Sequence, residues 1–488
     1  MSQSLQDILA SDTLRIALVY FLGPAFVIAI FAFGKPLQML TIARNTFVES
    51  VRQPIYFILI MVSGIFQVLN VWGSAYSMGY TESAEVSGDN KLLLDVGLAT
   101  IFVCGTLLAA FISTAVISRE IENKTVLTVV SKPISRTAVV LGKYLGVAAA
   151  VTIAAVTMVM FLQMGIRHGV LSTAADELDM PVVLISAIAV FLAVGVAIWC
   201  NFFYGWVFTQ TATMLLCPFM IIAWLLIMPI NKHWELQPLL TNFKPQVTLA
   251  CISVVFALLV LTSISTAASA RLGQVMTIVV CSGLFVFGLL SNHFVGSRAF
   301  ENTFVAKFEK VSPERSDQAE LFNSGDSYNV QFLFEPTAKI AVGMPAYFSA
   351  NPNGFPMSTY AFTAPDPLKY DFSKPDTPHL KGLEPALVFS KVAGRNATIT
   401  HVGPDAKLLR FPPMPDDFVF VTPTRIHPVA VAAWGVIPNV QFFWLVDAVT
   451  QNQPVPASHL VLIIFYAIAQ IGIFLSLAVI LFQTREVG

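Results

Sequence analysis

Long stretches of apolar residues decide what this chain can fold into. A helix that crosses the hydrocarbon core of a bilayer needs about 20 largely apolar residues, and nine stretches of the sequence meet that requirement. The chain is 56% hydrophobic and only 12% charged, a composition that a water-soluble globule could not bury within its own surface. The sequence therefore predicts a polytopic α-helical membrane protein with about nine spans. These predicted spans are roughly residues 14–34, 55–75, 92–117, 144–166, 182–204, 211–230, 247–268, 273–292 and 458–482.

The positive charges in the short connections indicate how the chain is oriented, because Lys and Arg stay on the cytoplasmic side. One set of alternate connections holds ten Lys and Arg residues, and the other set holds four. We therefore expect the N-terminus outside, the C-terminus inside, and the long polar stretch 293–457 outside. This topology places the protein in the cell (inner or plasma) membrane as a multi-pass protein.

The polar stretch 293–457 predicts a Pro-rich, β-containing extracytoplasmic domain. It holds 14 of the 28 prolines between residues 345 and 428, and short stretches such as VQFLFE, ALVFS, ATITHV and DFVFVTP alternate with turn residues. Near its end, Gly435 and Pro438 interrupt an apolar run that also carries Trp434 and Trp444. Tryptophan suits the headgroup boundary, so we expect two short interfacial helices there.

Residues 37–53 alternate apolar and charged positions at helical spacing, which predicts an amphipathic helix on the cytoplasmic leaflet. Pro54 ends this helix, because the residue before a proline leaves the helical region. A span-flanking helix that only anchors the chain would show the same pattern. The apolar positions are Leu40, Phe47, Val48 and Val51, and the charged positions are Arg44, Glu49 and Arg52.

The longest cytoplasmic connection mixes charges with hydrophobic residues, which indicates a docking segment for a cytoplasmic partner. Pro133 ends one helix and Ser131 or Ser135 caps the next, so a rigid helix–turn–helix elbow is expected between two spans. This connection reads ISREIENKTVLTVVSKPISRTAVVLGKYLG over residues 117–146.

These residues resemble the type 2 permease subunits of ABC exporters, in particular the multicopper-enzyme-maturation type. The family pattern is close to SREIE, then SKP[IV]SR, then GKYLG, and these elements stand here at 118–122, 131–136 and 142–146. The C-terminal segments IPNVQFFWLVDAV, PVPASHL and FQTREVG are also similar, whereas the match at LLVLTSISTAASARLG is weaker. The resemblance covers about half the chain, namely 37–166, 247–293 and 435–488. The first span, the hairpin 182–230 and the outer domain depart from the family's common six-span plan.

The resemblance implies a permease that exports a substrate with ATP hydrolysed by a separate ABC ATP-binding subunit, beside a second permease copy or a related permease. It also implies that the elbow helix and the loop contact that ATPase. Alternatively, the charges of this segment only fix the topology and lie in solvent. The implied interface residues are Arg119, Glu120, Glu122, Lys124, Lys132, Arg136, Arg44 and Glu49.

The sequence lacks the GxxxxGK[ST] phosphate loop, so we expect no ATPase activity and no bound cofactor in this chain; ATP would be bound by the partner subunit. Its histidines and cysteines have no ligand spacing, so no metal site is predicted, and no nucleic-acid partner is expected. Gln67, Asn70 and Gln163 are polar enough to line a substrate path, although hydrogen bonding between helices explains such residues as well.

Two other functions stay open. One is a membrane-anchored assembly or receptor protein that acts through its outer domain, and the other is an ATP-independent carrier. The second is disfavoured because the predicted spans hold hardly any ionisable residue. The predicted segments are 1–36 with an extra span, 37–53 with the elbow helix, 54–292 with the transmembrane core and the coupling loop 118–143, 293–457 with the outer domain, and 458–488 with the last span and cytoplasmic tail.

Overall fold

The computed structural model divides the chain into two compact units, a helical unit and a β unit. Within the residues that it describes, the helical unit consists of 36–289 and 438–484, and the β unit consists of 290–437. The described residues are 36–74, 88–118, 135–171, 177–239, 241, 243–315, 322–354, 362, 384–404, 409, 412–446, 449, 455 and 457–484.

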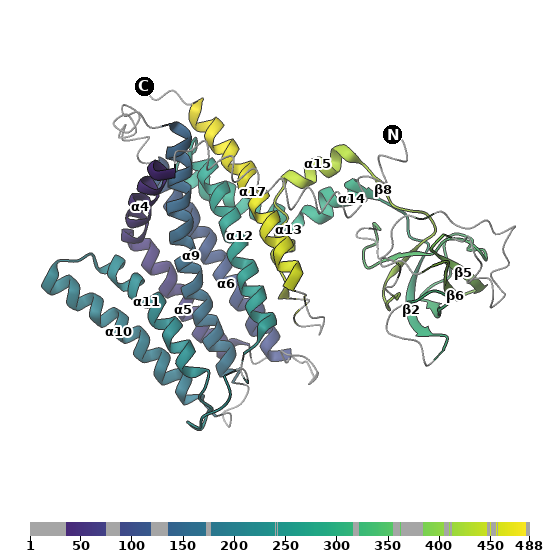
Figure 1. The fold of residues 1–488 in the computed structure, drawn as a ribbon, viewed down its shortest axis with the longest axis horizontal. Coiled ribbons are helices and arrows are strands. Elements are labelled where there is room, and N and C mark those ends of the chain that lie inside the picture. The colour runs from purple at the N-terminus through teal and green to yellow at the C-terminus, as the bar shows by residue number, and fades with distance from the viewer. Residues whose placement is uncertain are drawn as a thin grey trace. The chain divides into compact units, whose positions relative to one another are not determined.

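Eight helices within the described ranges are long and apolar enough to cross a membrane. They correspond to eight of the nine predicted spans, and the remaining one, 14–34, lies outside the described residues. The chain is therefore a polytopic α-helical membrane protein (Figure 1). The helices of this unit are α4 Pro36–Arg52, α5 Pro54–Gly73, α6 Gly88–Ser113 with a π-helical extension Thr114–Ser118, α9 Arg136–His168, α10 Met180–Tyr204, α11 Phe208–Ile227, α12 Pro245–Ser269, α13 Gln274–Ser291 and α17 Ala457–Gln483.

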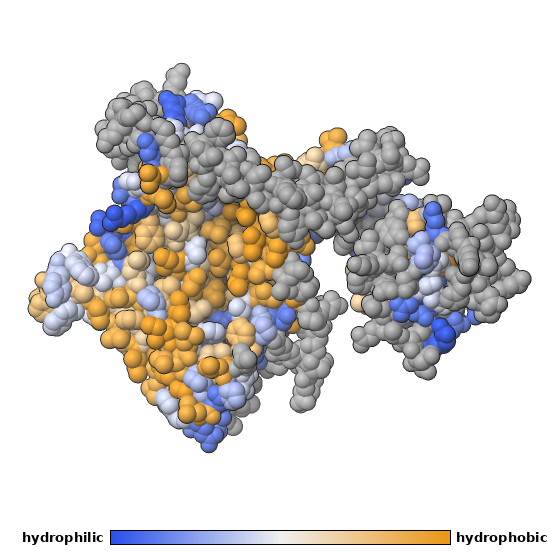
Figure 2. Space-filling view, in the orientation of Figure 1, coloured by the Kyte–Doolittle hydropathy of each residue, from blue (hydrophilic) through white to orange (hydrophobic). Residues whose placement is uncertain are grey.

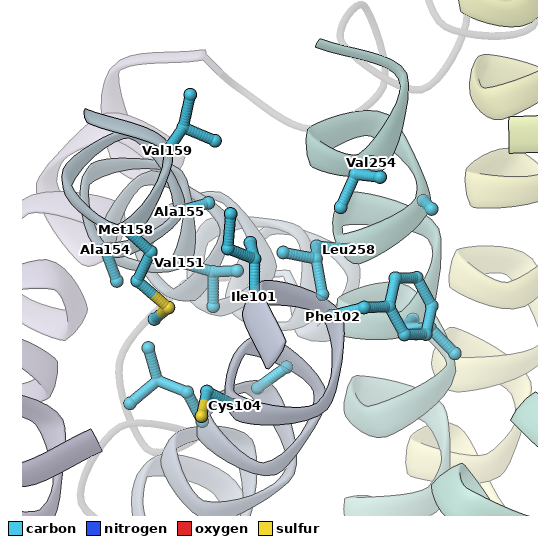
Figure 3. Close-up of a cluster of buried hydrophobic side chains, with 14 of the residues drawn as sticks. Ile101, Phe102, Cys104, Val151, Ala154, Ala155, Met158, Val159, Val254 and Leu258 are labelled. Carbon is cyan, nitrogen blue, oxygen red and sulfur yellow. The ribbon is translucent and has the colours of Figure 1, made fainter. Parts of the chain in front are cut away.

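The centre of the helical unit is α9, which packs against α4, α5, α6, α11, α12 and α17. Small residues make this possible, since helices in lipid associate through close van der Waals packing. Figure 3 shows Val151 and Ala155 of α9 gathered with Ile101 of α6 and Leu258 of α12, all of them buried. The core of the unit therefore lies where α6, α9 and α12 meet.

The helices α10 and α11 form a hairpin. Gly205 ends α10 with a left-handed backbone conformation, φ 67°, which glycine adopts without steric cost. The hairpin packs on the unit through α11, while α10 exposes large side chains such as Phe191 and Phe202. This exposure suits a helix whose outer face contacts lipid.

Residues 438–446 return into the helical unit after the β unit. The carbonyl oxygen of Phe443 accepts a hydrogen bond from Ser253 Oγ on α12 (2.7 Å), and the amide of Asn439 donates to Tyr466 Oη on α17 (2.8 Å). The short 3₁₀ helix Val440–Phe443 packs inside the helical unit, and the two compact units divide after residue 437. The predicted bounds of the outer domain, 293–457, stay a prediction.

The β unit contains a six-stranded antiparallel sheet in the order β4-β7-β2-β3-β6-β5. The sheet closes on itself, because Ala346, just before β4, donates to the carbonyl of Leu387 on β5 (2.8 Å). A β-containing domain is thus confirmed. The predicted stretches VQFLFE, ALVFS and ATITHV overlap β3, β5 and β6, and DFVFVTP contains β7. The strands are β2 Ala306–Pro313, β3 Ser327–Phe332, β4 Tyr347–Ser349, β5 Ala386–Ala393, β6 Asn396–Val402 and β7 Phe418–Phe420, with a separate pair β1 Phe300–Glu301 and β8 Arg425–Ile426.

Aromatic side chains fill the interior of this closed sheet. Phe308, Phe332, Phe348 and Phe389 are all fully buried, and the rings of Phe308 and Phe332 stack at a centroid distance of 6.0 Å. Such large rings bury much apolar surface for each residue, so a unit this small still has a core of its own. A short helix, α15 Pro428–Val436, follows the last strand at one of the two places where an interfacial helix was predicted.

Candidate functional site

The elbow helix α4 packs directly against α9 at two glycines. A Cβ atom on Gly146 would lie 2.5 Å from the carbonyl oxygen of Ala43, and one on Gly142 would lie 2.9 Å from that of Met39. Only glycine allows backbones to approach so closely. The GKYLG motif of the sequence is thus the surface on which α4 rests, and Figure 1 shows α4 lying against this part of α9.

The face of α4 that packs on α9 differs from the predicted apolar face. Met39, Thr46 and Ser50 are buried, whereas Leu40, one of the four residues of the apolar face predicted to lie on the leaflet, is 61% exposed. Ser50 Oγ donates to the carbonyl of Thr46 within the helix (2.6 Å), which satisfies the buried hydroxyl. Small and polar residues therefore make this contact, because bulky ones would hold the helices apart.

A groove with a volume of about 550 Å³ lies along the exposed side of α4. Its charged lining residues are Arg44, Glu49 and Arg52. Figure 2 shows hydrophilic surface over α4 beside a broad apolar surface on the rest of the helical unit. Because both signs of charge alternate along it, this groove suits a protein segment with a complementary charge pattern.

Arg52 also ties the end of α4 to the start of α11. Its Nε donates to Gln210 Oε1 (2.8 Å), and its carbonyl accepts from Thr209 Oγ1 (3.0 Å). Gln53 then takes an extended conformation before Pro54, which starts α5, as the pre-proline position predicted. The elbow between α4 and α5 is thereby fixed from the side.

The lysine within GKYLG makes a buried contact at the end of α6. Lys143 is 7% exposed and its Nζ donates to the carbonyl of Val116 (2.7 Å), in the π-helical turn that precedes residue 119. A positive charge is favourable at a helix C-terminus, and single π-helical turns are frequent at functional sites. Two residues after Val116, Ser118 Oγ donates to the carbonyl of Leu272 (3.2 Å).

Two arginines hold the last turn of α17 at the same end of the unit. Arg136 Nη1 donates to the carbonyl of Gln483 (3.0 Å), while Arg271 Nε donates to that of Leu481 (3.0 Å) and Nη2 to Thr484 Oγ1 (2.5 Å). These are charge-assisted bonds to carbonyls that lack a partner within the helix. We call this end, formed by α4, the start of α9 and the end of α17, the elbow end.

The structure describes three of the eight predicted interface residues. Arg44 and Glu49 line the α4 groove, while Arg136 holds α17. The other five, which lie outside the described residues, are Arg119, Glu120, Glu122, Lys124 and Lys132.

The three polar residues predicted to line a substrate path are buried between helices. Gln67 Nε2 donates to the carbonyl of Gly97 (2.8 Å) and Asn70 Nδ2 donates to that of Leu93 (2.8 Å), both joining α5 to α6. Gln163 Nε2 lies 3.7 Å from Cys251 Sγ on α12. These contacts match the alternative of hydrogen bonding between helices, and a role along the substrate path stays a prediction.

An ion pair is buried at the opposite end of α9. Arg167 Nη1 lies 2.6 Å from Asp179 Oδ2, with 9% and 0% of the two side chains exposed, and Arg167 Nη2 also donates to the carbonyl of Ile230 (2.9 Å). Asp179 caps α10 as well. The predicted span 144–166 ended before these charges, but α9 extends from 136 to 168 and so carries Lys143 and Arg167 near its two ends.

A model of the family described as "ABC-2 family transporter protein" matches residues 40–250 of this chain. That range contains the α4 groove, the two glycines beneath α4 and the α10–α11 hairpin. Neither curated proteins nor solved structures gave a match.

Proposed function

We propose that this chain is an ABC-2-type permease, namely the permease subunit of an exporter driven by a separate ATPase chain. The match over residues 40–250 and the eight membrane-length helices support this proposal. The ATPase docks at the elbow end. This end lies on the cytoplasmic side of the cell (inner or plasma) membrane. A second permease copy or a related permease completes the transporter.

The observation that carries this proposal is the close packing of α4 on the two glycines of α9. A groove that binds a partner is useful for coupling only if the partner's motion reaches the spans. With Ala43 and Met39 in backbone-level contact with α9, α4 has little freedom to slide alone, so a force on the groove displaces α9, the central helix of the unit.

The neighbouring bonds extend this coupling to other spans. Lys143 joins α9 to the end of α6, and Arg136 joins it to the end of α17. We infer that closure of the ATPase moves the elbow end between two arrangements and so opens the path to alternate sides of the membrane. The role of the charges in residues 119–134 stays a prediction from the sequence.

Purification of the tagged full-length chain in mild detergent, with partners identified by mass spectrometry, tests the proposal. We expect a stoichiometric ATP-binding subunit with the wild type. The variant Arg44→Glu/Glu49→Arg keeps the groove's net charge but inverts its pattern, so it should reduce the recovered ATPase at least about tenfold, as like charges across an interface cost several kcal/mol.

A charge inversion outside the groove serves as the control. Glu314 and Lys391 form an exposed pair in the β unit (3.1 Å), so Glu314→Lys/Lys391→Glu should leave the recovery unchanged. Equal recovery with both variants would refute the groove as the docking site. If the wild type yields no ATPase, the exporter assignment fails, and a receptor acting through the β unit becomes the better explanation.

A further inference from the structure

The segment 438–446 places irregular backbone at membrane depth. Its contact Ser253 lies eight residues into α12, about 12 Å along the helix axis. Its other contact, Tyr466, lies nine residues into α17, which corresponds to about 13 Å. Non-helical backbone is tolerated at such depth only where protein buries it or where it lines a cavity.

This segment does line a cavity. Together with α6 and α13 it encloses a space of about 580 Å³, within the range of about 300–1,000 Å³ that is typical of small-molecule sites. The walls are Phe102 and Val103 from α6 and Phe285 and Leu289 from α13. The rings of Phe102 and Phe285 lie 4.7 Å apart, so they form one continuous aromatic wall.

The polar groups of the cavity come from the returning segment. Gln441 is exposed and Trp444 is half-buried, and both line the space. Among the described residues that line the cavity none is charged. The cavity is open at the surface of the helical unit, where Val103 is 51% exposed.

We propose that this cavity binds the hydrocarbon chain of a long-chain amphiphile with an uncharged hydrogen-bonding headgroup, and that such amphiphiles are the substrate class. The substrate assignment rests on the proposed function. The apolar walls accept the chain, while the amide of Gln441 and the indole N–H of Trp444 hydrogen-bond the headgroup. A small ion or a sugar would leave its polar groups unsatisfied against four apolar walls, whereas a lipid-like molecule enters from the bilayer beside Val103.

A photoreactive monoacylglycerol, with a diazirine in its chain, tests this inference on the full-length chain in nanodiscs. We expect crosslinks to peptides of α6 and of the segment 438–446, which an excess of unmodified monoacylglycerol suppresses. Val103→Trp fills the cavity and should lower this labelling at least about tenfold, because it removes space for several methylene groups. Gln441→Leu should weaken it by about fivefold through loss of the headgroup contact.

Val286→Trp provides a matched control. Val286 is 52% exposed, equal within 1% to Val103, but it lies on α13 outside the cavity lining, so this variant should be labelled like the wild type. Equal labelling of Val103→Trp and Val286→Trp, or labelling that excess monoacylglycerol does not suppress, would show only bulk lipid contact and overturn the proposal. That result would leave the ATPase partnership standing, since the ATPase recovery experiment depends on the elbow end alone.

Discussion

The substitution Gly146→Ala tests whether close packing of α4 on α9 holds the elbow end together. The added Cβ would lie 2.5 Å from the carbonyl oxygen of Ala43 and 2.6 Å from Thr46 Cβ, where ordinary contact begins at about 3.4 Å. Since the first of these atoms belongs to the backbone, a rotamer change cannot relieve the clash. The two helices must separate by about 0.9 Å.

Two opposing effects set the size of the change. Overpacking a tight contact typically costs about 1–3 kcal/mol, whereas Ala in place of Gly within a helix stabilises it by about 1 kcal/mol. Gly195→Ala isolates the second effect, because a Cβ at Gly195 on α10 would meet nothing within 4 Å. The free energy of unfolding of Gly146→Ala should therefore lie about 1–3 kcal/mol below that of Gly195→Ala.

Thermal unfolding of both variants in the same detergent measures this difference, and ATP hydrolysis by the reconstituted transporter measures its effect on coupling. We expect a lower Tm and weaker substrate-stimulated hydrolysis for Gly146→Ala alone. Gly142→Ala should give a smaller change of the same sign, since its closest atom lies at 2.8 Å. If Gly146→Ala has the same Tm and hydrolysis rate as Gly195→Ala, the close contact does not hold α4 in place and our reasoning fails.

Two further predictions concern charges elsewhere in the chain. Arg167→Met removes the partner that lies 2.6 Å from the buried carboxylate of Asp179, and it should lower the free energy of unfolding by about 3–5 kcal/mol. The double variant Arg167→Met/Asp179→Leu should recover much of this stability. Equal Tm values of the single and double variants would contradict the prediction. In the β unit, the pKa of Asp417 is raised, and burial is the largest cause. The negative charge of Asp416 also raises this pKa, whereas the hydrogen bond from the Met414 amide lowers it. The folded unit therefore holds the proton more tightly than the unfolded chain, so its stability falls as pH rises from the ordinary Asp pKa through the raised one. Asp417→Asn should flatten this slope in calorimetry of the full-length chain, and an unchanged slope would exclude Asp417 as its source.

Much of the fold was predictable because hydropathy and strand patterns are properties of single segments. Eight apolar runs became eight membrane-length helices, and ALVFS and ATITHV became the paired strands β5 and β6. The turn between these strands contains Gly394 with φ 60°, a conformation that glycine adopts readily.

The sequence did not predict the contacts that depend on which residues pack against each other in the fold. The sequence identified Gly142 and Gly146 only as part of the GKYLG motif. Glycine has no side chain and so gives no hydrophobic signal, even where it permits the closest helix contact. For the same reason the sequence did not predict that Thr46 and Ser50 are buried. The packing of the returning segment also depends on distant partners, because its Gly, Pro and Trp pattern does not reveal that Ser253 and Tyr466 satisfy its backbone.

The elbow end and the cavity are joined by the same helix. At the elbow end, Arg136 and Arg271 hold the last turn of α17, and farther along α17 the hydroxyl of Tyr466 holds Asn439 at the start of the returning segment. A hydrogen-bonded helix resists compression along its axis, so a displacement of its last turn moves Tyr466 with it. The segment that carries Gln441 and Trp444 would then shift against α6 and α13. Such a shift would change the volume of the cavity without any direct contact between the α4 groove and the amphiphile that we propose.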